Sequence, residues 1–436
     1  MRAIVLEQYV VVPADTVTPS RRLWLAPLFA LFCGTTAALA EASRDFVVPA
    51  ASPAVAPALA TVLAAVSAER IHAHMAWLSD PAREGRGLGT TGLEATRAYL
   101  TRELAVLGIE PLGDDPAARG GAAFLQRVPL RIGRALAGDG NPSDRNWYAA
   151  LNPRRAAGPR PHGVARSLVA RSERRADANL VAIHRGRSSD SAVVIGAHMD
   201  HLGKPGGVLH PGADDNASGV AALLEIARAV ASLPEPLALS VVFVFWTGEE
   251  LGHFGSSHYV REPRWPLGRT AVYINLDMIA HPWRPEELAA LGAPLGRAAG
   301  DEFLARVTPS HFAEPGIDHG SPWLADLLAQ AGHSTGMALH LDRTDGTDGG
   351  SDYRAFARAG LPWVRFFGNF FPAYHQPGDV LADIDAGQVA RMARLALATV
   401  WLAAEKGPAS AASDAVATVQ PPAARSNTSD ESATAP

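Results

Sequence analysis

Short apolar runs that alternate with helical patterns constrain the fold of this chain more than any other feature of its sequence. From residue 179 onward, five runs of four to eight apolar residues are separated by stretches with helical apolar spacing. Because continuous apolar strands are buried on both faces, the pattern predicts an α/β fold: a mixed, mostly parallel central sheet sandwiched by helices. The predicted strands cover 180–183, 192–197, 239–246, 271–276 and 362–367, and the predicted helices cover 217–232, 249–261, 323–332 and 386–406.

The rest of the chain adds a helical opening and two ends of low complexity. Apolar residues show helical spacing over 59–76 and 92–107. The Pro/Arg/Gly-rich stretch 131–177 is predicted to be a loop-rich excursion, because it is too short for an inserted domain of roughly 100 residues. We therefore predict one domain at 61–405, a loose lead-in at 41–60 and a disordered tail at 406–436.

The first 40 residues have the pattern of a secretory signal with an extended n-region. An apolar stretch at 23–39 follows Arg21 and Arg22 and ends in a small-residue cleavage site before Glu41. A transmembrane anchor is the alternative, but Pro27 and the small-residue end of the stretch favour cleavage. We expect an exported protein, periplasmic or secreted, with no stable membrane anchor after signal cleavage.

Cysteine usage and charge exclude several classes of function. Cys33 is the single cysteine and lies within the signal, so the mature chain has neither disulfides nor thiolate ligands. Any metal site must then use histidine and carboxylate ligands. The formal net charge of −5 comes from 44 acidic and 39 basic residues without a long run of either sign, so no nucleic-acid partner is expected.

Polar side chains interrupt the apolar pattern where the predicted strands end. A single such residue is usually solvated or a helix cap, and Asp215 could cap the helix that follows it. Glu249 and Glu250 could likewise form the acidic first turn of a helix. Four loops of this kind indicate a binding site instead, because ligands collect at the carboxyl ends of strands in α/β sheets. The residues are His198, Asp200, Asp214, Asp215, Glu249, Glu250 and Asp277.

Six motifs follow one another along the chain: GAHMDH at 196–201, GADDNASG at 212–219, TGEELG at 247–252, NLD at 275–277, GSD at 350–352 and YH at 374–375. In order and spacing they resemble the M28 family of zinc aminopeptidases. The resemblance covers roughly residues 60–405, including the turn at 84–86. It implies a single catalytic domain with a zinc-exopeptidase-like fold.

The resemblance also implies a ligand set for two Zn²⁺ ions per chain. His198, Asp215 and Asp277 would hold one ion, while Asp215, Glu250 and His375 would hold the other. Asp215 would bridge them, because a carboxylate can offer one oxygen to each of two ions about 3.5–4 Å apart.

Three further residues receive catalytic roles from the same resemblance. Glu249 would be the general base for a metal-bridging water. Asp200 would orient the His198 imidazole, with a plain surface carboxylate as the alternative. Tyr374 would donate to the oxyanion, with a packing role as the alternative. Five other histidines near these motifs are expected to bind no metal, with His201 at most lining the pocket: His201, His210, His253, His258 and His281.

The activity implied is hydrolysis of the N-terminal peptide bond in peptides with a free N-terminus. A glutaminyl cyclase with one zinc, or a dipeptidase or carboxypeptidase on the same fold, are the enzymatic alternatives. A non-catalytic binding module is the alternative from another class, and gaps in the ligand set would mark it. Aromatic residues in 366–374 and the stretch 278–349 are expected to form an apolar substrate pocket.

Overall fold

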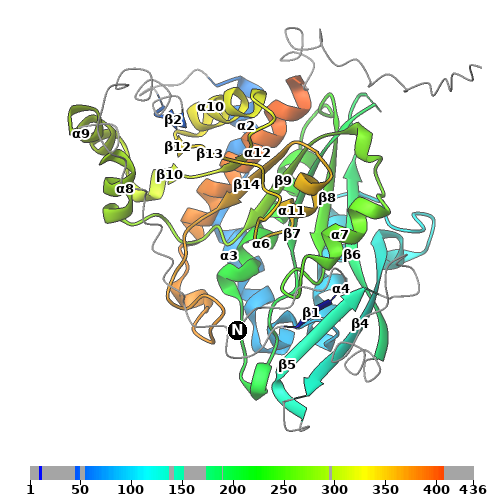
Figure 1. Cartoon of the computed structure of the whole chain (residues 1–436). Coiled ribbons are helices and arrows are strands. Elements are labelled where there is room, and N and C mark those ends of the chain that lie inside the picture. The colour runs from blue at the N-terminus through cyan, green and yellow to red at the C-terminus, as the bar shows by residue number, and fades with distance from the viewer. Residues whose placement is uncertain are drawn as a thin grey trace, which may run out of the picture.

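A mixed sheet crosses the centre of the molecule, and helices pack on both of its faces (Figure 1). The computed structural model describes residues 9–11, 45–49, 55–136, 142–151, 173–188, 190–293 and 297–406. Within these residues, eleven strands form the sheet in the order β1-β5-β4-β6-β8-β7-β9-β14-β11-β13, with β3 paired to β6. A second, three-stranded sheet has the order β10-β12-β2.

The elements have the following bounds. The helices are α2 Pro57–Ala64, α3 Ala68–Ser79, α4 Thr91–Val106, α6 Gly219–Ala231, α7 Phe254–Arg261, α8 Pro285–Gly292, α9 Arg297–Arg306, α10 Trp323–Thr335, α11 Tyr353–Arg358 and α12 Ala386–Lys406. The strands are β1 Tyr9–Val11, β2 Phe46–Val47, β3 Glu110–Pro111, β4 Leu125–Leu136, β5 Pro142–Leu151, β6 Glu173–His184, β7 Ala192–His198, β8 Ser240–Trp246, β9 Thr270–Asp277, β10 Phe312–Ala313, β11 Gly316–Asp318, β12 Ala338–His340, β13 Asp342–Thr344 and β14 Trp363–Phe367.

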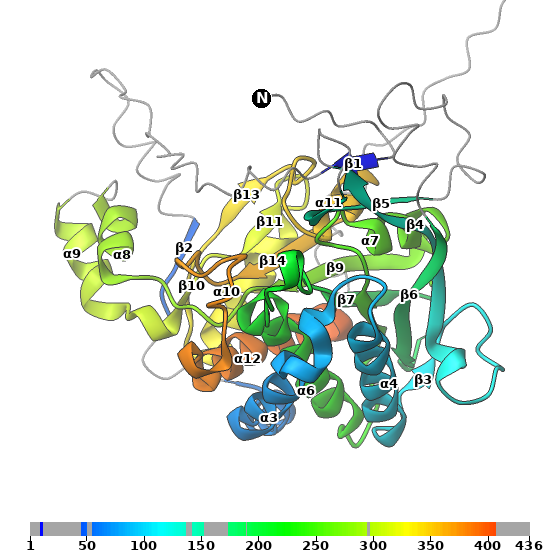
Figure 2. The ribbon, with the colours of Figure 1, turned by 90° about the horizontal axis from the view of Figure 1, so that it is seen from below.

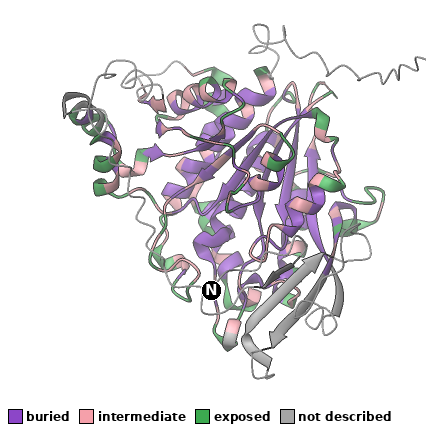
Figure 3. Cartoon of the chain, viewed as in Figure 1, coloured by how far each residue is buried: buried purple, intermediate pink, exposed green. Residues whose placement is uncertain are grey.

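The predicted mixed α/β sheet between helical layers is confirmed. The expectation of a mostly parallel sheet is wrong, because only four of the ten strand pairs described in the large sheet are parallel. Strands β8, β7, β9 and β14 run parallel side by side, while β6 and β4 pair antiparallel at one flank. Figure 2 shows α3, α4, α6 and α12 beneath the sheet and α7 and α11 on its other face. Every residue of β7, β8 and β9 is buried, as the purple centre of Figure 3 shows. Burial on both faces explains why these strands are continuous apolar runs.

The stretch 131–177 differs from the sequence-based expectation of loops. Residues 131–136 continue β4, 142–151 form β5, and β6 begins at 173, so antiparallel strands occupy much of it. Strand pairing uses backbone groups, which most residue types supply equally. A composition rich in Pro, Arg and Gly therefore did not exclude strands here.

The helix predicted over 249–261 is shorter than expected. Residues 249–253 form a tight turn in which the N–H groups of Gly252 and His253 both donate to the Glu249 carbonyl, at 2.8 and 2.9 Å. Gly252 and His253 have positive φ angles of 128° and 55°, which a helix does not accept, so α7 begins at Phe254. This turn holds Glu249 and Glu250 outside the helix.

The predicted signal at 1–40 and tail at 406–436 fall almost entirely outside the described residues. In the part of the chain that the structure describes, no helix is both long and apolar enough to cross a membrane.

A buried arginine fastens the helical opening to the loops at the sheet edge. Arg86 has a left-handed φ of 49° and no exposed surface. Burial lowers the pKa of its guanidinium to about 10, so it stays charged at neutral pH. The guanidinium donates to five backbone carbonyls, those of Leu78, Met199, Pro211, Gly212 and Asp215.

Replacing Arg86 with Met is expected to destabilise the fold by about 3 kcal/mol or more, because several buried carbonyls lose their donor at once. Chemical denaturation measures the change. Arg83→Met is the control on the same turn: the Arg83 guanidinium lies 4.1 Å from the centroid of the Trp77 ring, a contact worth about 0.5–1 kcal/mol. Equal effects of the two substitutions would contradict the role given to Arg86.

Candidate metal centre

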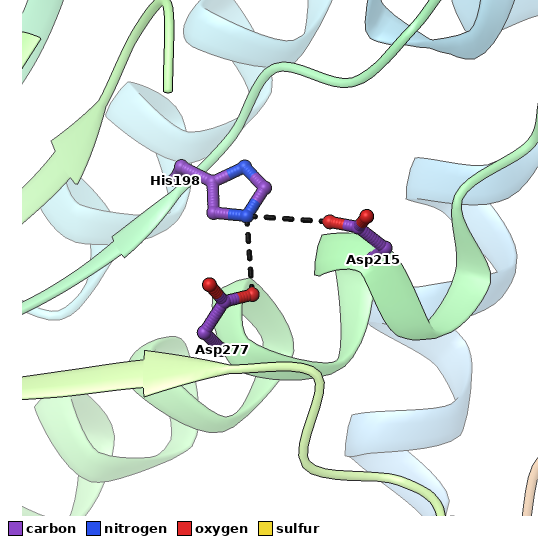
Figure 4. Close-up of side chains that lie close together, drawn as sticks. All are labelled: His198, Asp215 and Asp277. Carbon is purple, nitrogen blue, oxygen red and sulfur yellow. Dashed lines mark hydrogen bonds and ion pairs between the residues drawn. The ribbon is translucent and has the colours of Figure 1, made fainter. Parts of the chain in front are cut away.

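Two parallel strands bring His198 and Asp277 together at one edge of the sheet. His198 ends β7 and Asp277 ends β9, its neighbour in the sheet. The His198 Nε2 lies 3.2 Å from Asp277 Oδ1 and 3.3 Å from Asp215 Oδ1. Figure 4 shows that the imidazole faces both carboxylates. All three residues are buried, and they form a first group of convergent donor atoms.

A second group shares Asp215 with the first. The His375 Nε2 lies 3.0 Å from Asp215 Oδ2 and 3.1 Å from Glu250 Oε2. Each oxygen of Asp215 therefore faces a different histidine. The five residues expected as ligands converge on one place, although they come from five separate segments of the chain.

The spacing of these donor atoms matches a tetrahedral metal site. With ligand bonds of about 2.0–2.1 Å, a tetrahedral zinc keeps its ligand atoms about 3.3 Å apart. The four distances from His198 and His375 to their carboxylates lie between 3.0 and 3.3 Å. Histidine and carboxylate donors also suit this metal. The donor set therefore fits zinc, and Asp215 is shared by the two groups.

A network of hydrogen bonds holds the Asp215 loop in place. The carboxylate of Asp379 accepts the N–H groups of Asp214 and Asp215, at 2.8 and 3.0 Å. The Asn216 side chain donates to the Leu276 carbonyl at 3.0 Å and accepts the N–H of Met278 at 3.3 Å, which ties this loop to the end of β9. The peptide bond between Asp215 and Asn216 is cis. Asp379 and Asn216 were not identified from the sequence, because these contacts join distant segments.

Glu249 lies beside the cluster and belongs to neither donor group, and its backbone is held by Asp200. Asp200 was expected to orient His198 through its carboxylate, but the structure places that carboxylate elsewhere. The backbone carbonyl of Asp200 lies 3.1 Å from His198 Nδ1 and orients the ring, whereas Asp200 Oδ1 accepts the N–H of Glu249 at 3.2 Å. The side chain of Asp200 thus fixes the backbone of the Glu249 turn. Residue spacing could not distinguish these two contacts.

Ionisable groups in the cluster strongly perturb one another. Burial lowers the pKa of His375, but Glu250 and Asp215 outweigh burial and raise it to about 11. Burial and Asp215 raise the pKa of Glu250, yet His375 and His201 hold it at about 2. Burial raises the pKa of Glu249 well above its usual value. The buried carboxylates thus make the site strongly favourable for positive charge. A metal cation can supply that charge once the histidines lose their protons.

A cavity of about 520 Å³ opens over the two groups. Glu249 and Tyr374 line it, and burial raises the pKa of the Tyr374 hydroxyl, so this hydroxyl remains a hydrogen-bond donor at neutral pH. The Tyr374 ring stacks on His375 with 3.9 Å between centroids, so the residue packs as well as lining the cavity. The apolar part of the wall consists of Leu251, Met278, Phe366, Phe367 and Phe370.

His201 lies much closer to the cluster than expected. Its Nδ1 is 2.5 Å from Glu250 Oε1 and 3.8 Å from Asp215 Oδ2, and its side chain is fully buried. His201, Asp215 and Glu250 form another set of donor atoms close enough to hold an ion, and this set shares Asp215 and Glu250 with the His375 group. The sequence offered one indication that His201 is near the site: it directly follows Asp200 in the 196–201 motif.

The other four histidines differ in their surroundings. His253 Nε2 is 3.1 Å from Glu249 Oε1, so it reaches the site. His281 stacks on Phe371, and its Nε2 is 3.8 Å from Asp214 Oδ2. His210 contacts the carbonyl of Val208. His258 lies on α7 and belongs to neither donor group.

The model of peptidase family M28 matches residues 179–400, slightly more than half of the chain. This chain belongs to peptidase family M28. The matched segment of the M28 chain begins in β6 and ends in α12, so it contains all five convergent donor residues and Glu249.

Curated relatives of this M28 chain carry aminopeptidase names. It is 31% identical over 228 residues to the probable lipoprotein aminopeptidase LpqL of Mycobacterium tuberculosis, covering 48% of this chain and 41% of that one. It is 28% identical over 221 residues to aminopeptidase YwaD of Bacillus subtilis, covering 49% and 41%. The chain thus spans about two fifths of the length of these relatives.

Solved structures support the fold. The M28 chain superposes on BSAP, a zinc aminopeptidase from Bacillus subtilis, with a TM-score of 0.52 and 17% identity, covering 78% of this chain and 96% of that one. It superposes on LapA of Legionella pneumophila with a TM-score of 0.52 and 16% identity, covering 80% and 74%. At these identities the likeness establishes a shared fold.

Proposed function

We propose that this chain is a zinc-dependent aminopeptidase that hydrolyses the N-terminal bond of peptides. The observation that carries the proposal is the pair of donor groups around His198 and His375, joined by Asp215 beneath an open cavity, with Glu249 beside them. The aminopeptidase names of the relatives support the choice of substrate.

Two Zn²⁺ ions fit the donor set. His198 and Asp277 would hold one ion, His375 and Glu250 the other, and Asp215 would contribute one oxygen to each. When bound, the ions would polarise the scissile carbonyl and acidify a water. The short contact between His201 and Glu250 would keep the Glu250 carboxylate oriented toward its ion.

The residues of the chain perform the proton transfers. Glu249 is within the cavity, is not part of either donor group, and has a pKa raised by burial. A raised pKa makes a carboxylate a stronger base, so Glu249 can take a proton from the attacking water and return it to the departing amine. Tyr374 can donate its hydroxyl hydrogen to the developing oxyanion. The apolar wall around Phe366 and Phe370 suits an apolar N-terminal side chain.

Hydrolysis of an amino-acid p-nitroanilide is the direct test. We expect turnover of the leucine derivative, loss of turnover with a chelator, and recovery when zinc is restored. N-acetyl-leucine p-nitroanilide is the matched control substrate and should resist cleavage, because it has no free amine. Turnover of the acetylated substrate at an equal rate would contradict aminopeptidase action, and the absence of turnover for a panel of amino-acid anilides would contradict the proposal as a whole.

Metal analysis of the purified protein tests the number of ions. The two donor groups lead us to expect about two zinc ions per chain. One ion per chain would favour a glutaminyl cyclase over a peptidase.

The proposal includes export. It rests on the apolar stretch at 23–39 after Arg21 and Arg22. N-terminal sequencing of the protein recovered outside the cytoplasm checks it, and an intact N-terminus would contradict it.

A further inference from the structure

His253, the residue just before α7, directly contacts Glu249. Its Nε2 lies 3.1 Å from Glu249 Oε1. Its side chain is 13% exposed, so water competes little for this contact. Neither residue belongs to the donor groups that could hold metal, so the contact depends on the protein alone.

The backbone at His253 adopts an uncommon conformation that brings its ring back over Glu249. With φ 55° and ψ 39°, His253 lies in the left-handed region, which costs free energy for a residue with a Cβ. Glycine adopts this conformation freely, and asparagine is among the other residues that visit it. Such a conformation beside the reacting groups leads to the hypothesis that the side chain serves the site.

The ring of His253 has two polar neighbours: Oε1 of Glu249, 3.1 Å from Nε2, and the backbone of Gly350. Burial lowers the pKa of His253, whereas the Asp352 carboxylate and the hydrogen bond to Gly350 raise it by smaller amounts. With a hydrogen on Nε2, the nitrogen that faces Glu249, the ring donates to the carboxylate oxygen. This bond fixes one oxygen of Glu249 and leaves the other free to meet a water in the cavity, which both residues line.

We propose that His253 is a positioning residue for the general base: its Nε2–H orients Glu249 for proton transfer. The inference rests on the proposed hydrolase function and deepens it. The sequence motifs suggested only a packing role for His253, and this proposal gives it a role in the site. The positive φ angles at Gly252 and His253 then serve to orient the imidazole toward Glu249.

Substitution with Asn separates positioning from folding. Asn accepts the left-handed backbone but is too short to reach Glu249. For His253→Asn we expect an unchanged or higher melting temperature, unchanged zinc content, little change in KM, and a kcat lower by about 10- to 100-fold, the usual cost of losing a supporting hydrogen bond. His253→Gln, whose longer amide can donate to Glu249, is expected to recover part of kcat.

His258→Asn is the matched control, because it makes the same change within α7, the helix that follows His253, at a residue outside both donor groups. It should leave kcat unchanged. A wild-type protein that hydrolyses peptides while His253→Asn keeps full kcat would overturn this inference alone. Loss of zinc from His253→Asn, or equal losses of kcat in both variants, would also overturn it. An inactive wild-type protein would overturn the proposed function and this inference together.

Discussion

Replacing Glu249 with Gln is expected to abolish nearly all peptide hydrolysis while both metals stay bound. Gln has almost the same shape and can still accept the Nε2–H of His253, but it cannot take a proton from water. Loss of a general base costs about 10²- to 10⁴-fold in rate. Turnover of leucine p-nitroanilide measures the loss, and metal analysis of the same sample measures retention of zinc.

The neighbouring residue supplies the control for this experiment. Glu250→Gln makes the same chemical change one position further along the chain, at a residue whose Oε2 lies 3.1 Å from His375 Nε2. It is expected to lose activity together with one zinc ion. If Glu249→Gln lost zinc, or retained most of its activity, the assignment of Glu249 as base would be wrong.

Asp215→Asn should disable both metal positions at once. Asp215 Oδ1 faces His198 and Oδ2 faces His375, at 3.3 and 3.0 Å. The amide of Asn offers one oxygen, and its NH₂ group cannot bind a cation. We therefore expect zinc content to fall from about two ions to one or fewer per chain, with no measurable hydrolysis.

Thermal unfolding gives a readout of Asp215→Asn that does not depend on activity. Zinc that binds only the folded protein stabilises it by about 4 kcal/mol at a thousandfold excess over its dissociation constant. The wild-type melting temperature should therefore rise when zinc is returned to the chelated protein, and the rise should be much smaller in the variant. Asp348→Asn, at a side chain that is 98% exposed, is the matched control and should respond as wild type. An undiminished response of Asp215→Asn would contradict the bridging role.

The central sheet was predictable because its strands are buried on both faces. Strands predicted at 192–197 and 239–246 are observed as Ala192–His198 and Ser240–Trp246. The antiparallel strands within 131–177 were missed, because their pairing depends on backbone groups and on neighbours distant in sequence. The late start of the predicted 249–261 helix was missed for a local reason: a histidine, and not a glycine, occupies the left-handed position at 253.

The sequence by itself determined which residues stand at the ends of the buried strands, because apolar runs stop where the chain leaves the sheet. His198, Asp215, Glu250 and Asp277 stood out in that pattern, and the resemblance to the M28 family added His375 and the role of all five as ligands. Only the tertiary structure decided how their neighbours are used. In the folded chain the Asp200 carboxylate accepts the N–H of Glu249, His201 contacts Glu250, and His253 contacts Glu249. Such contacts join loops that lie far apart in the sequence. A difference of a few ångströms decides which side chains meet, and the spacing of residues along the chain does not contain that distance.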